Sequence, residues 1–195
     1  MRLFSDNIFR KKYFFLFACF FSVFAVFAEP QFEFGVGSGY VFYGNKDLKN
    51  LLSDFDQKSQ VILCGDFSVD FPVAEPVKLV FGMDSIMDAR WKGSEHFILW
   101  DYCGFAGFKI YPGLAGLCTT IQYCLGRRTD FVSLQDIEDY TESTNFGNGF
   151  AFCISYDFGY GKKGYAPEVC ANWRHMPRGG SSDNILEVKF RLSKN

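Results

Sequence analysis

The sequence has little charge, little histidine and no excess of basic residues. Only 22% of its 195 residues are charged, 2 are histidine, and 20 basic against 22 acidic residues give a formal net charge of −2. Without a basic field the chain has nothing to hold a nucleic-acid backbone, which excludes nucleic acid as a partner. The mean hydropathy of −0.01 is too low for a bundle of transmembrane helices. Aromatic residues are abundant, at 19% with 25 Phe, and this argues against a disordered chain.

The first 28 residues have the order of an export signal. Basic residues between Arg2 and Lys12 precede an uncharged apolar run over 13–28, which ends on the small residue Ala28. This order is typical of a cleaved secretory signal. As a helix the run would reach about 24 Å, short of a hydrocarbon core of about 30 Å, so an uncleaved anchor is the weaker alternative. Lipoprotein processing at Cys19 is another. We expect a signal peptide at 1–28 and one mature domain at 29–195.

The mature chain alternates with a period of two, and no long stretch has a clear helical period. Within 32–42 the even positions are mostly Phe, Val or Tyr, and the odd positions are mostly Glu or Gly. Because successive side chains of a strand point to opposite faces, one face of such a strand is apolar and the other is small or charged. Eight stretches of this kind begin near residues 32, 60, 77, 97, 117, 150, 165 and 186.

The length of these stretches indicates a membrane barrel. Most reach ten residues, whereas strands of soluble proteins average about five or six and transmembrane strands need about 9–11. Lipid tolerates no open sheet edge, so eight such strands are expected to close on themselves. Longer connections, at 44–58, 133–145 and 177–184, alternate with shorter ones. The predicted fold class is therefore all-β: an eight-stranded antiparallel up-and-down transmembrane β-barrel.

The faces opposite the apolar ones carry eight acidic and seven basic residues. We expect these to pair inside the barrel, because an unpaired charge out of water is costly. Inward glycines such as Gly35 and Gly37 would make room for the long basic side chains. The predicted interior polar network comprises Asp66, Asp70, Lys78, Asp84, Asp88, Arg90, Asp101, Lys109, Arg128, Asp157, Glu168, Arg174, Glu187, Lys189 and Arg191.

Alternation alone does not say which face points outward, because a soluble barrel would hide its apolar faces inside. Three features favour lipid outside: the export signal, the long strands, and large aromatic residues near strand ends on the apolar face. The prediction is wrong if Phe67, Phe81 and Phe152 meet in the middle of the molecule while Asp66, Asp84 and Arg174 lie in water.

With these features the chain resembles the small eight-stranded outer-membrane barrels of diderm bacteria, of the OmpX, OmpW and OmpA-domain types. The resemblance covers nearly all of 29–195. It rests on the number of strands, the alternation of long and short loops, the export segment and the alternating last stretch at 186–192. It implies an outer-membrane location after export, contact with outer-membrane lipid, and the barrel-assembly machinery as a partner during insertion. Such chains usually end on an aromatic residue, whereas this one continues through 193–195.

The sequence is compatible with four functions. The first is a structural or surface-interaction barrel with a filled interior, whose outer loops meet external ligands. The second is a narrow transporter for small hydrophobic molecules, as the OmpW type implies. The third is a soluble exported barrel that holds a lipid-like ligand. The fourth is a lipid-modifying enzyme that uses His96 and His175 at the rim; their spacing matches no catalytic motif, so we expect that the chain is not an enzyme. The predicted hydrophobic path of the transporter consists of Ile62, Val80, Ile86, Phe97, Leu99 and Phe105.

Six cysteines remain in the mature chain, all on faces predicted to be interior. They are Cys64, Cys103, Cys118, Cys124, Cys153 and Cys170. No spacing among them resembles a metal knuckle, so no metal or cofactor is expected. Their even number in an exported chain leaves open small interior fillers and cross-strand bridges. The acidic run at 136–142 is expected to be a solvated part of an outer loop.

Overall fold

The computed structural model describes residues 29–53, 55, 59–135, 138–162 and 164–194. The export segment predicted at 1–28 lies outside these residues. The described chain contains nine strands and one helix. They are β1 (Gln31–Phe42), α2 (Lys46–Ser53), β2 (Gln60–Ala74), β3 (Val77–Lys92), β4 (Glu95–Ile110), β5 (Leu117–Ser133), β6 (Tyr140–Ser143), β7 (Gly147–Asp157), β8 (Tyr165–Arg178) and β9 (Ser181–Lys194). Within the same residues no helix combines the length and the apolar character needed to cross a bilayer.

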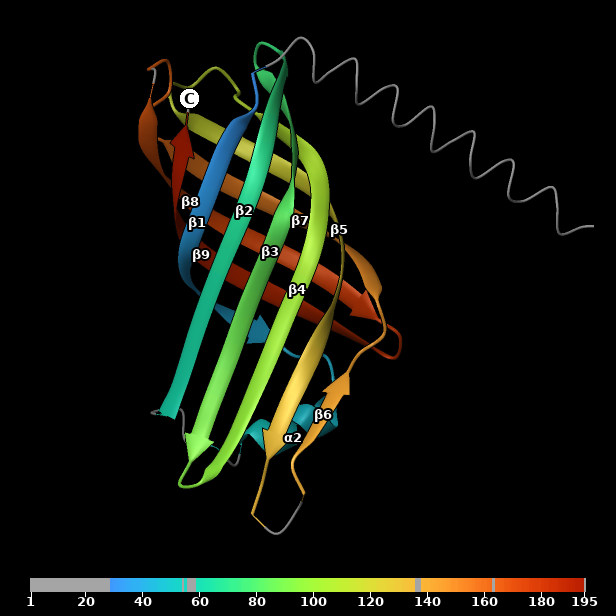
Figure 1. Ribbon diagram of the computed structural model, residues 1–195. Helices are drawn as coiled ribbons and strands as arrows, with labels where there is room; N and C mark the ends of the chain where they lie inside the picture. The colour runs from blue at the N-terminus through green and yellow to red at the C-terminus, as the bar shows by residue number, and fades with distance from the viewer. Residues whose placement is uncertain (1–28, 54, 56–58, 136–137, 163, 195) are drawn as a thin grey trace, which may run out of the picture.

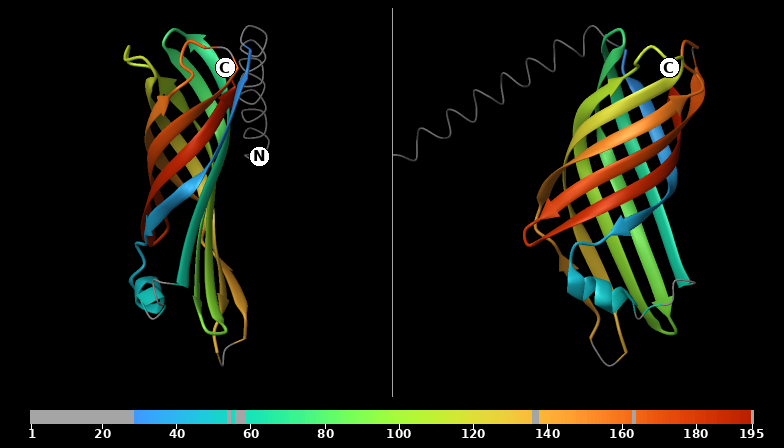
Figure 2. Two further views of the ribbon diagram at one scale, coloured as in Figure 1. Left: turned by 90° about the vertical axis from the view of Figure 1, so that its left-hand side faces the viewer. Right: turned by 180° about the vertical axis from the view of Figure 1, so that it is seen from behind.

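The strands form one closed antiparallel ring. Their order is β4-β3-β2-β1-β9-β8-β7-β5, and pairing of β4 with β5 closes the ring (Figures 1 and 2). The short β6 pairs with 129–132 of β5, directly beyond the stretch of β5 that pairs with β7, so β6 extends the line of β7. Eight strands therefore build the wall, and the predicted eight-stranded up-and-down barrel is confirmed.

The register around the ring fixes the stagger of the barrel. If paired residues are followed from strand to strand around the barrel, starting at Arg127 of β5, the path returns to β5 at Leu117. The two positions on β5 differ by ten residues. The circuit passes through Arg127, Tyr102, Ser85, Gly65, Val36, Phe190, Val169, Tyr156 and Leu117. Stagger and strand number together set the tilt, which for barrels of this size is about 35–45°. The interior of such a barrel is filled by side chains.

Both ends of the described chain lie at the same end of the barrel, here called the terminal end, and α2 lies at the other, here called the α2 end (Figure 1). Strands β2 to β5 have 15–17 residues, whereas β7 has 11. The four long neighbours extend the wall beyond the rest of the barrel on one side of the α2 end (Figure 2).

The predicted rhythm of long and short connections is only partly correct. The segments at 44–58 and 133–145 are long, but they contain α2 and β6. The third predicted loop, 177–184, is a turn at Gly179 and Gly180, because β8 continues to Arg178 and β9 begins at Ser181. Residues that were expected in a loop therefore belong to strands, and β8 and β9 are longer than predicted.

The helix α2 was not predicted, although its signals are present in the sequence. The side-chain oxygen of Asn45 accepts hydrogen bonds from the backbone N–H groups of Asp47 (2.9 Å) and Leu48 (3.3 Å), which is the geometry of a helix N-cap. Leu48 and Leu52, one turn apart, are both buried. Eight residues are too short to show a sustained helical period, so this helix depends on its packing against the barrel.

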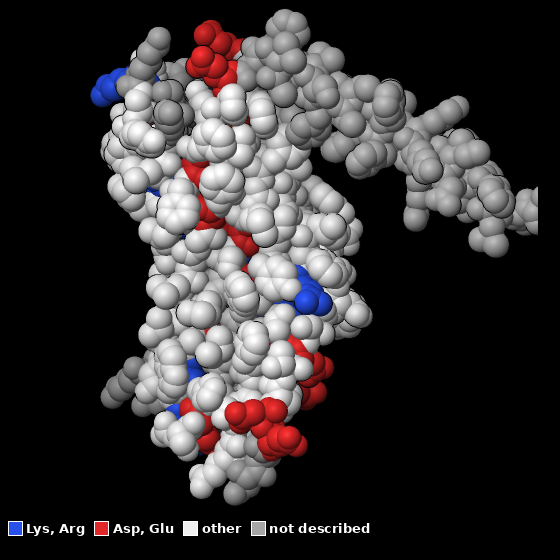
Figure 3. Space-filling view, viewed as in Figure 1, with Lys and Arg blue, Asp and Glu red and all other residues white. Residues whose placement is uncertain are grey.

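The apolar faces point outward and the charged faces point inward. Phe67 and Phe152 are 46% and 39% exposed, whereas Asp66 and Arg174 are 5% and 0% exposed. Figure 3 shows one side of the resulting wall, where uncharged residues predominate between the two ends and a few acidic and basic atoms are visible. Such a wall is suited to hydrocarbon and would aggregate in water. The soluble-barrel alternative is therefore wrong.

Candidate functional site: the barrel interior and its cap

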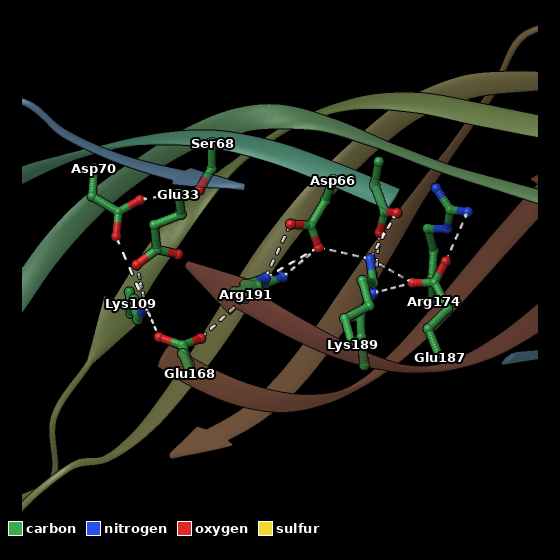
Figure 4. A network of polar contacts seen from close by, with 12 residues as sticks. Glu33, Asp66, Ser68, Asp70, Lys109, Glu168, Arg174, Glu187, Lys189 and Arg191 are labelled. Atoms are coloured by element: carbon green, nitrogen blue, oxygen red, sulfur yellow. Dashed lines mark hydrogen bonds and ion pairs between the residues drawn. The ribbon is translucent and has the colours of Figure 1, made fainter. Parts of the chain in front are cut away.

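Near the terminal end, one lysine is held by three carboxylates. Lys109 on β4 places its Nζ 2.6 Å from Glu33 Oε1, 2.5 Å from Glu168 Oε2 and 4.0 Å from Asp70 Oδ2. These partners come from β1, β8 and β2, so the contacts cross the lumen and not only the wall (Figure 4). All four side chains are buried, so the lysine offsets carboxylates that water cannot reach.

Two further cations continue this arrangement towards the middle of the barrel (Figure 4). Arg191 links Glu168 (3.2 Å) to Asp66 (2.9 Å). Lys189 then places its Nζ within 3.0 Å of carboxylate oxygens of Asp66, Asp84 and Glu187. Because Asp66 and Glu168 are each shared between cations, the ion pairs form one connected network.

Three arginines continue the network towards the α2 end, and the first of them, Arg174, lies 3.9 Å from Glu187. Arg174 lies 3.2 Å from Asp101 and also donates a 2.6 Å hydrogen bond to Cys103 Sγ. Arg178 pairs with Asp101 and with Asp183 (2.8 Å). Arg128 then pairs with Asp183 (2.7 Å) and with Asp130 (2.7 Å). The interior polar network thus extends from the terminal end through the middle of the barrel towards the α2 end.

A missing side chain on β1 makes room for this network. A Cβ atom at Gly35 would lie 2.6 Å from Asp66 Oδ1 and 2.7 Å from Arg191 Cγ, closer than real Cβ contacts. The predicted role of this glycine therefore has a direct geometric basis.

At the α2 end the lumen beneath the helix is apolar. Leu48 and Leu52 of α2, with Phe55 beyond it, pack against inward residues of the strands. The strand members of this apolar cluster are Val41, Cys64, Ile86, Phe97, Leu99, Val132 and Ile185, with Ile62 at its margin. The α2 end of the barrel is therefore closed by an ordinary hydrophobic core.

A small polar cluster attaches α2 to the wall. Asp88 accepts hydrogen bonds from Tyr43 (2.9 Å), Gln60 (2.8 Å) and Arg90 (3.0 Å). Arg90 also donates to the backbone carbonyl of Leu52 at the end of α2 (3.3 Å). Burial, together with the neighbouring Asp88 carboxylate, raises the pKa of Tyr43 well above its ordinary value, so Tyr43 stays a hydrogen-bond donor.

Most of the predicted network residues lie in the lumen. Lys78 is half-buried and the other fourteen are buried. Four of the fifteen lie outside the connected network. Asp88 and Arg90 belong to the polar cluster at α2. Near the terminal end, Lys78 donates to the hydroxyl of Tyr111 (3.2 Å), which in turn donates to Asp157 (3.5 Å). Burial raises the pKa of Tyr111, which lies in the turn between β4 and β5.

Several network members were missed from the sequence: Glu33, Asp130, Asn172, Arg178 and Asp183. The last two fell in the predicted loop at 177–184. Period-two alternation does continue through Arg174, Met176 and Arg178, all of which are buried, and this signal would have placed Arg178 inside. Asn172 is an uncharged member that bridges Asp84 (3.2 Å) and Glu187 (2.7 Å).

The six residues of the predicted hydrophobic path fall in two separate groups. Ile62, Ile86, Phe97 and Leu99 belong to the apolar cluster under α2. Val80 and Phe105 belong to a second cluster that includes Cys103, Cys124 and Met176.

The remaining chemistry-bearing residues are not assembled into a site. His175 hydrogen-bonds to Asn184 (2.9 Å) beside the rings of Phe150 and Trp173, while His96 lies at the start of β4. The six cysteines of the described chain are buried and unbridged. Among the described residues no group of three or more His, Cys, Asp or Glu side chains is placed to hold a metal ion.

Comparison with known proteins supports the fold. No protein family and no curated protein matches the chain by sequence. Its fold is similar to the crystal structure of Neisserial surface protein A, with a TM-score of 0.53 and 9% identity over 86% of this chain and 97% of that chain. It is also similar to Ail, the attachment invasion locus protein of Yersinia pestis, with a TM-score of 0.58 and 9% identity over 85% of this chain and 98% of that chain. Ail has also been crystallised with the heparin analogue sucrose octasulfate.

At this level of identity the likeness concerns the fold. The chain has the architecture of the small eight-stranded outer-membrane barrels that its sequence resembles, and that expectation is confirmed for the fold.

Proposed function

We propose that this chain is an outer-membrane barrel of a diderm bacterium with a structural or surface-interaction role, and that it does not conduct solutes. Its uncharged outer wall supports insertion into lipid, and the barrel-assembly machinery would be its partner during insertion. The terminal end would face the periplasm. The α2 end, with the extended sheet of β2 to β5, would face the exterior and meet external ligands.

The observation that carries this proposal is the connected interior polar network. Side chains from opposite walls meet across the lumen, as the contacts of Lys109 and Lys189 show. Moving a solute through would require breaking ion pairs in a space that water does not reach, which is strongly unfavourable. No catalytic step is part of the proposal, because within the described residues His175 hydrogen-bonds to an amide, Asn184, and not to a carboxylate or a nucleophile.

Planar-bilayer recording tests the closed interior. The folded chain should give no steady conductance. Replacing both partners of one ion pair, Asp66→Ala with Arg191→Ala, removes bulk from the lumen at unchanged formal charge and should produce small conductance steps. The matched control replaces the exposed neighbours Lys46 and Asp47 of α2 with Ala and should stay silent. Steady conductance of the unmodified chain would contradict the proposal.

The narrow transporter is the second candidate, and one observation favours it. A cavity of about 310 Å³ lies beside α2, with Tyr40, Phe42, Leu52, Phe55 and Arg90 in its lining, and it adjoins the apolar cluster. A small hydrophobic molecule could enter there. Uptake of a hydrophobic fluorescent probe into vesicles that contain the barrel, abolished by Leu52→Trp, would favour this function over the first.

A further inference from the structure

The outer wall of the barrel contains a groove that the proposed function does not use. It has a volume of about 660 Å³ and crosses the outer faces of β1 to β5. Gly65 of β2 and Ser85 of β3 are register partners on adjacent strands, and both are small residues among bulky neighbours. The bulky lining residues are Phe34, Phe67, Met83, Trp100, Tyr102 and Phe131.

A cation lies in this groove without a carboxylate partner. The Nε of Arg127 donates a 2.5 Å hydrogen bond to the hydroxyl of Tyr102, and its guanidinium lies 5.4 Å from the ring centre of Phe146. In the described part of the chain this is its only hydrogen bond, and no carboxylate lies within ion-pair distance. The other described arginines each pair with a carboxylate: Arg90, Arg128, Arg174, Arg178 and Arg191.

The position of Arg127 along the wall is that of a membrane interface. The preceding outward residues of β5, Ile121, Tyr123 and Leu125, are all exposed and apolar. Arg127 is the first charge that follows them towards the α2 end. A lipid-facing arginine is costly at the centre of a bilayer but tolerated near its surface.

The groove descends from this position into the apolar band. Paired residues followed once around the barrel, from β5 through β4 and on past β1, return to β5 ten residues closer to the terminal end. Each step from one strand to the next therefore moves away from the α2 end and further into the apolar part of the wall. The step from Arg127 leads through Tyr102 and Ser85 to Gly65. A ligand that fills the groove would therefore have an anionic end at the interface and an apolar end within the bilayer.

We propose that this groove binds one phosphate-bearing lipid of the outer leaflet. The phosphate pairs with the free terminal nitrogens of Arg127, whose planar fork fits phosphate geometry. An acyl chain lies over Gly65 and Ser85 between the aromatic walls. Ser85 is itself fixed by a 2.7 Å hydrogen bond from Trp100 Nε1, so the floor of the groove is ordered. This inference rests on the proposed membrane insertion.

Native mass spectrometry of the barrel purified from membranes tests the site, with lipid A as the added probe and diacylglycerol, which has acyl chains but no phosphate, as the reference lipid. The unmodified chain should retain one lipid A, and Arg127→Gln should weaken retention about tenfold or more through loss of the charged contact. Gly65→Leu should weaken it similarly by filling the groove, and a Cβ at this position meets its nearest atom only at 3.4 Å. Lys92→Gln, which removes an exposed cation elsewhere at the α2 end, should leave retention unchanged.

Each outcome of this experiment has a distinct meaning. Competition by millimolar inorganic phosphate would point to a free anion and overturn the proposal, as would unchanged retention in Arg127→Gln or in Gly65→Leu. If Arg127→Gln does not fold, Gly65→Leu and the retention of lipid A by the unmodified chain still decide. A chain that fails to sediment with carbonate-washed membranes would contradict the proposed function, whereas a membrane-bound chain with no retained lipid A would contradict this site alone.

Discussion

The interior polar network and the apolar cluster under α2 fill the same lumen with opposite chemistry. The network lies behind the apolar outer wall, and there the lumen holds ion pairs beside a smaller apolar cluster that includes Val80, Phe105 and Met176. The cluster lies at the α2 end, where the chain meets water, and there α2 supplies buried leucines to an ordinary hydrophobic core. Hydrocarbon leaves the apolar side chains on the outer wall, while water drives them into the core.

The largest effect is expected from removing a cation of the interior polar network. Lys189→Met would leave Asp66, Asp84 and Glu187 without their shared partner, and breaking a buried ion pair in this way costs about 3–5 kcal/mol. The free energy of unfolding in urea, followed by the difference in gel mobility between folded and heated barrel, measures it. Lys46→Met, on the exposed side of α2, is the control and should change little. Equal stability of the two variants would mean that the network does not hold the barrel together.

A smaller and more local effect is expected in the apolar cluster. Leu52→Ala should cost about 2–4 kcal/mol, because it leaves a cavity between α2 and the strands. Limited trypsin cleavage after Lys49, within α2, should become faster while the urea transition of the barrel stays in place. Asn50→Ala, on the exposed side of the same helix, serves as the control. Loss of the whole barrel in Leu52→Ala would show that the two regions are one cooperative unit.

The N-cap of α2 should contribute less than its packing. Asn45→Ala removes two hydrogen bonds to the first turn and should destabilise the helix by about 1 kcal/mol. The same cleavage assay measures it, and Asn45→Asp, which can accept the same bonds, should retain protection. Equal cleavage of the Ala and Asp variants would argue against a capping role.

The smallest effect at neutral pH is expected at Tyr43. Tyr43→Phe removes one of three donors to Asp88 and should cost about 0.5 kcal/mol. Because the pKa of Tyr43 is raised in the folded state, its contribution is complete below its unfolded pKa of about 10 and is lost as the pH rises from there through the folded value. Protection of α2 from cleavage by a protease active in alkali should therefore fall above pH 10 in the unmodified chain and less so in Tyr43→Phe. Identical alkaline profiles would contradict this assignment.

Much of the fold could be predicted from the sequence because inward and outward residues alternate regularly along each strand. Alternation placed Lys189 and Glu187 inside without any knowledge of their partners. The partners themselves could not be predicted, because Lys109 meets Glu33 and Glu168 across a lumen that exists only once the ring has closed. The α2 helix escaped prediction for a different reason: its few apolar residues act only when the strands beneath them are present.

The central claim is that the apolar side chains of the wall contact acyl chains. Fluorescence quenching of Trp173, an outward residue of β8, tests it most directly. With Trp91 and Trp100 replaced by Phe, the barrel is placed in vesicles of phosphatidylcholine with or without bromine on the acyl chains. The account predicts strong quenching by the brominated lipid. Unchanged fluorescence of the vesicle-bound barrel would contradict it.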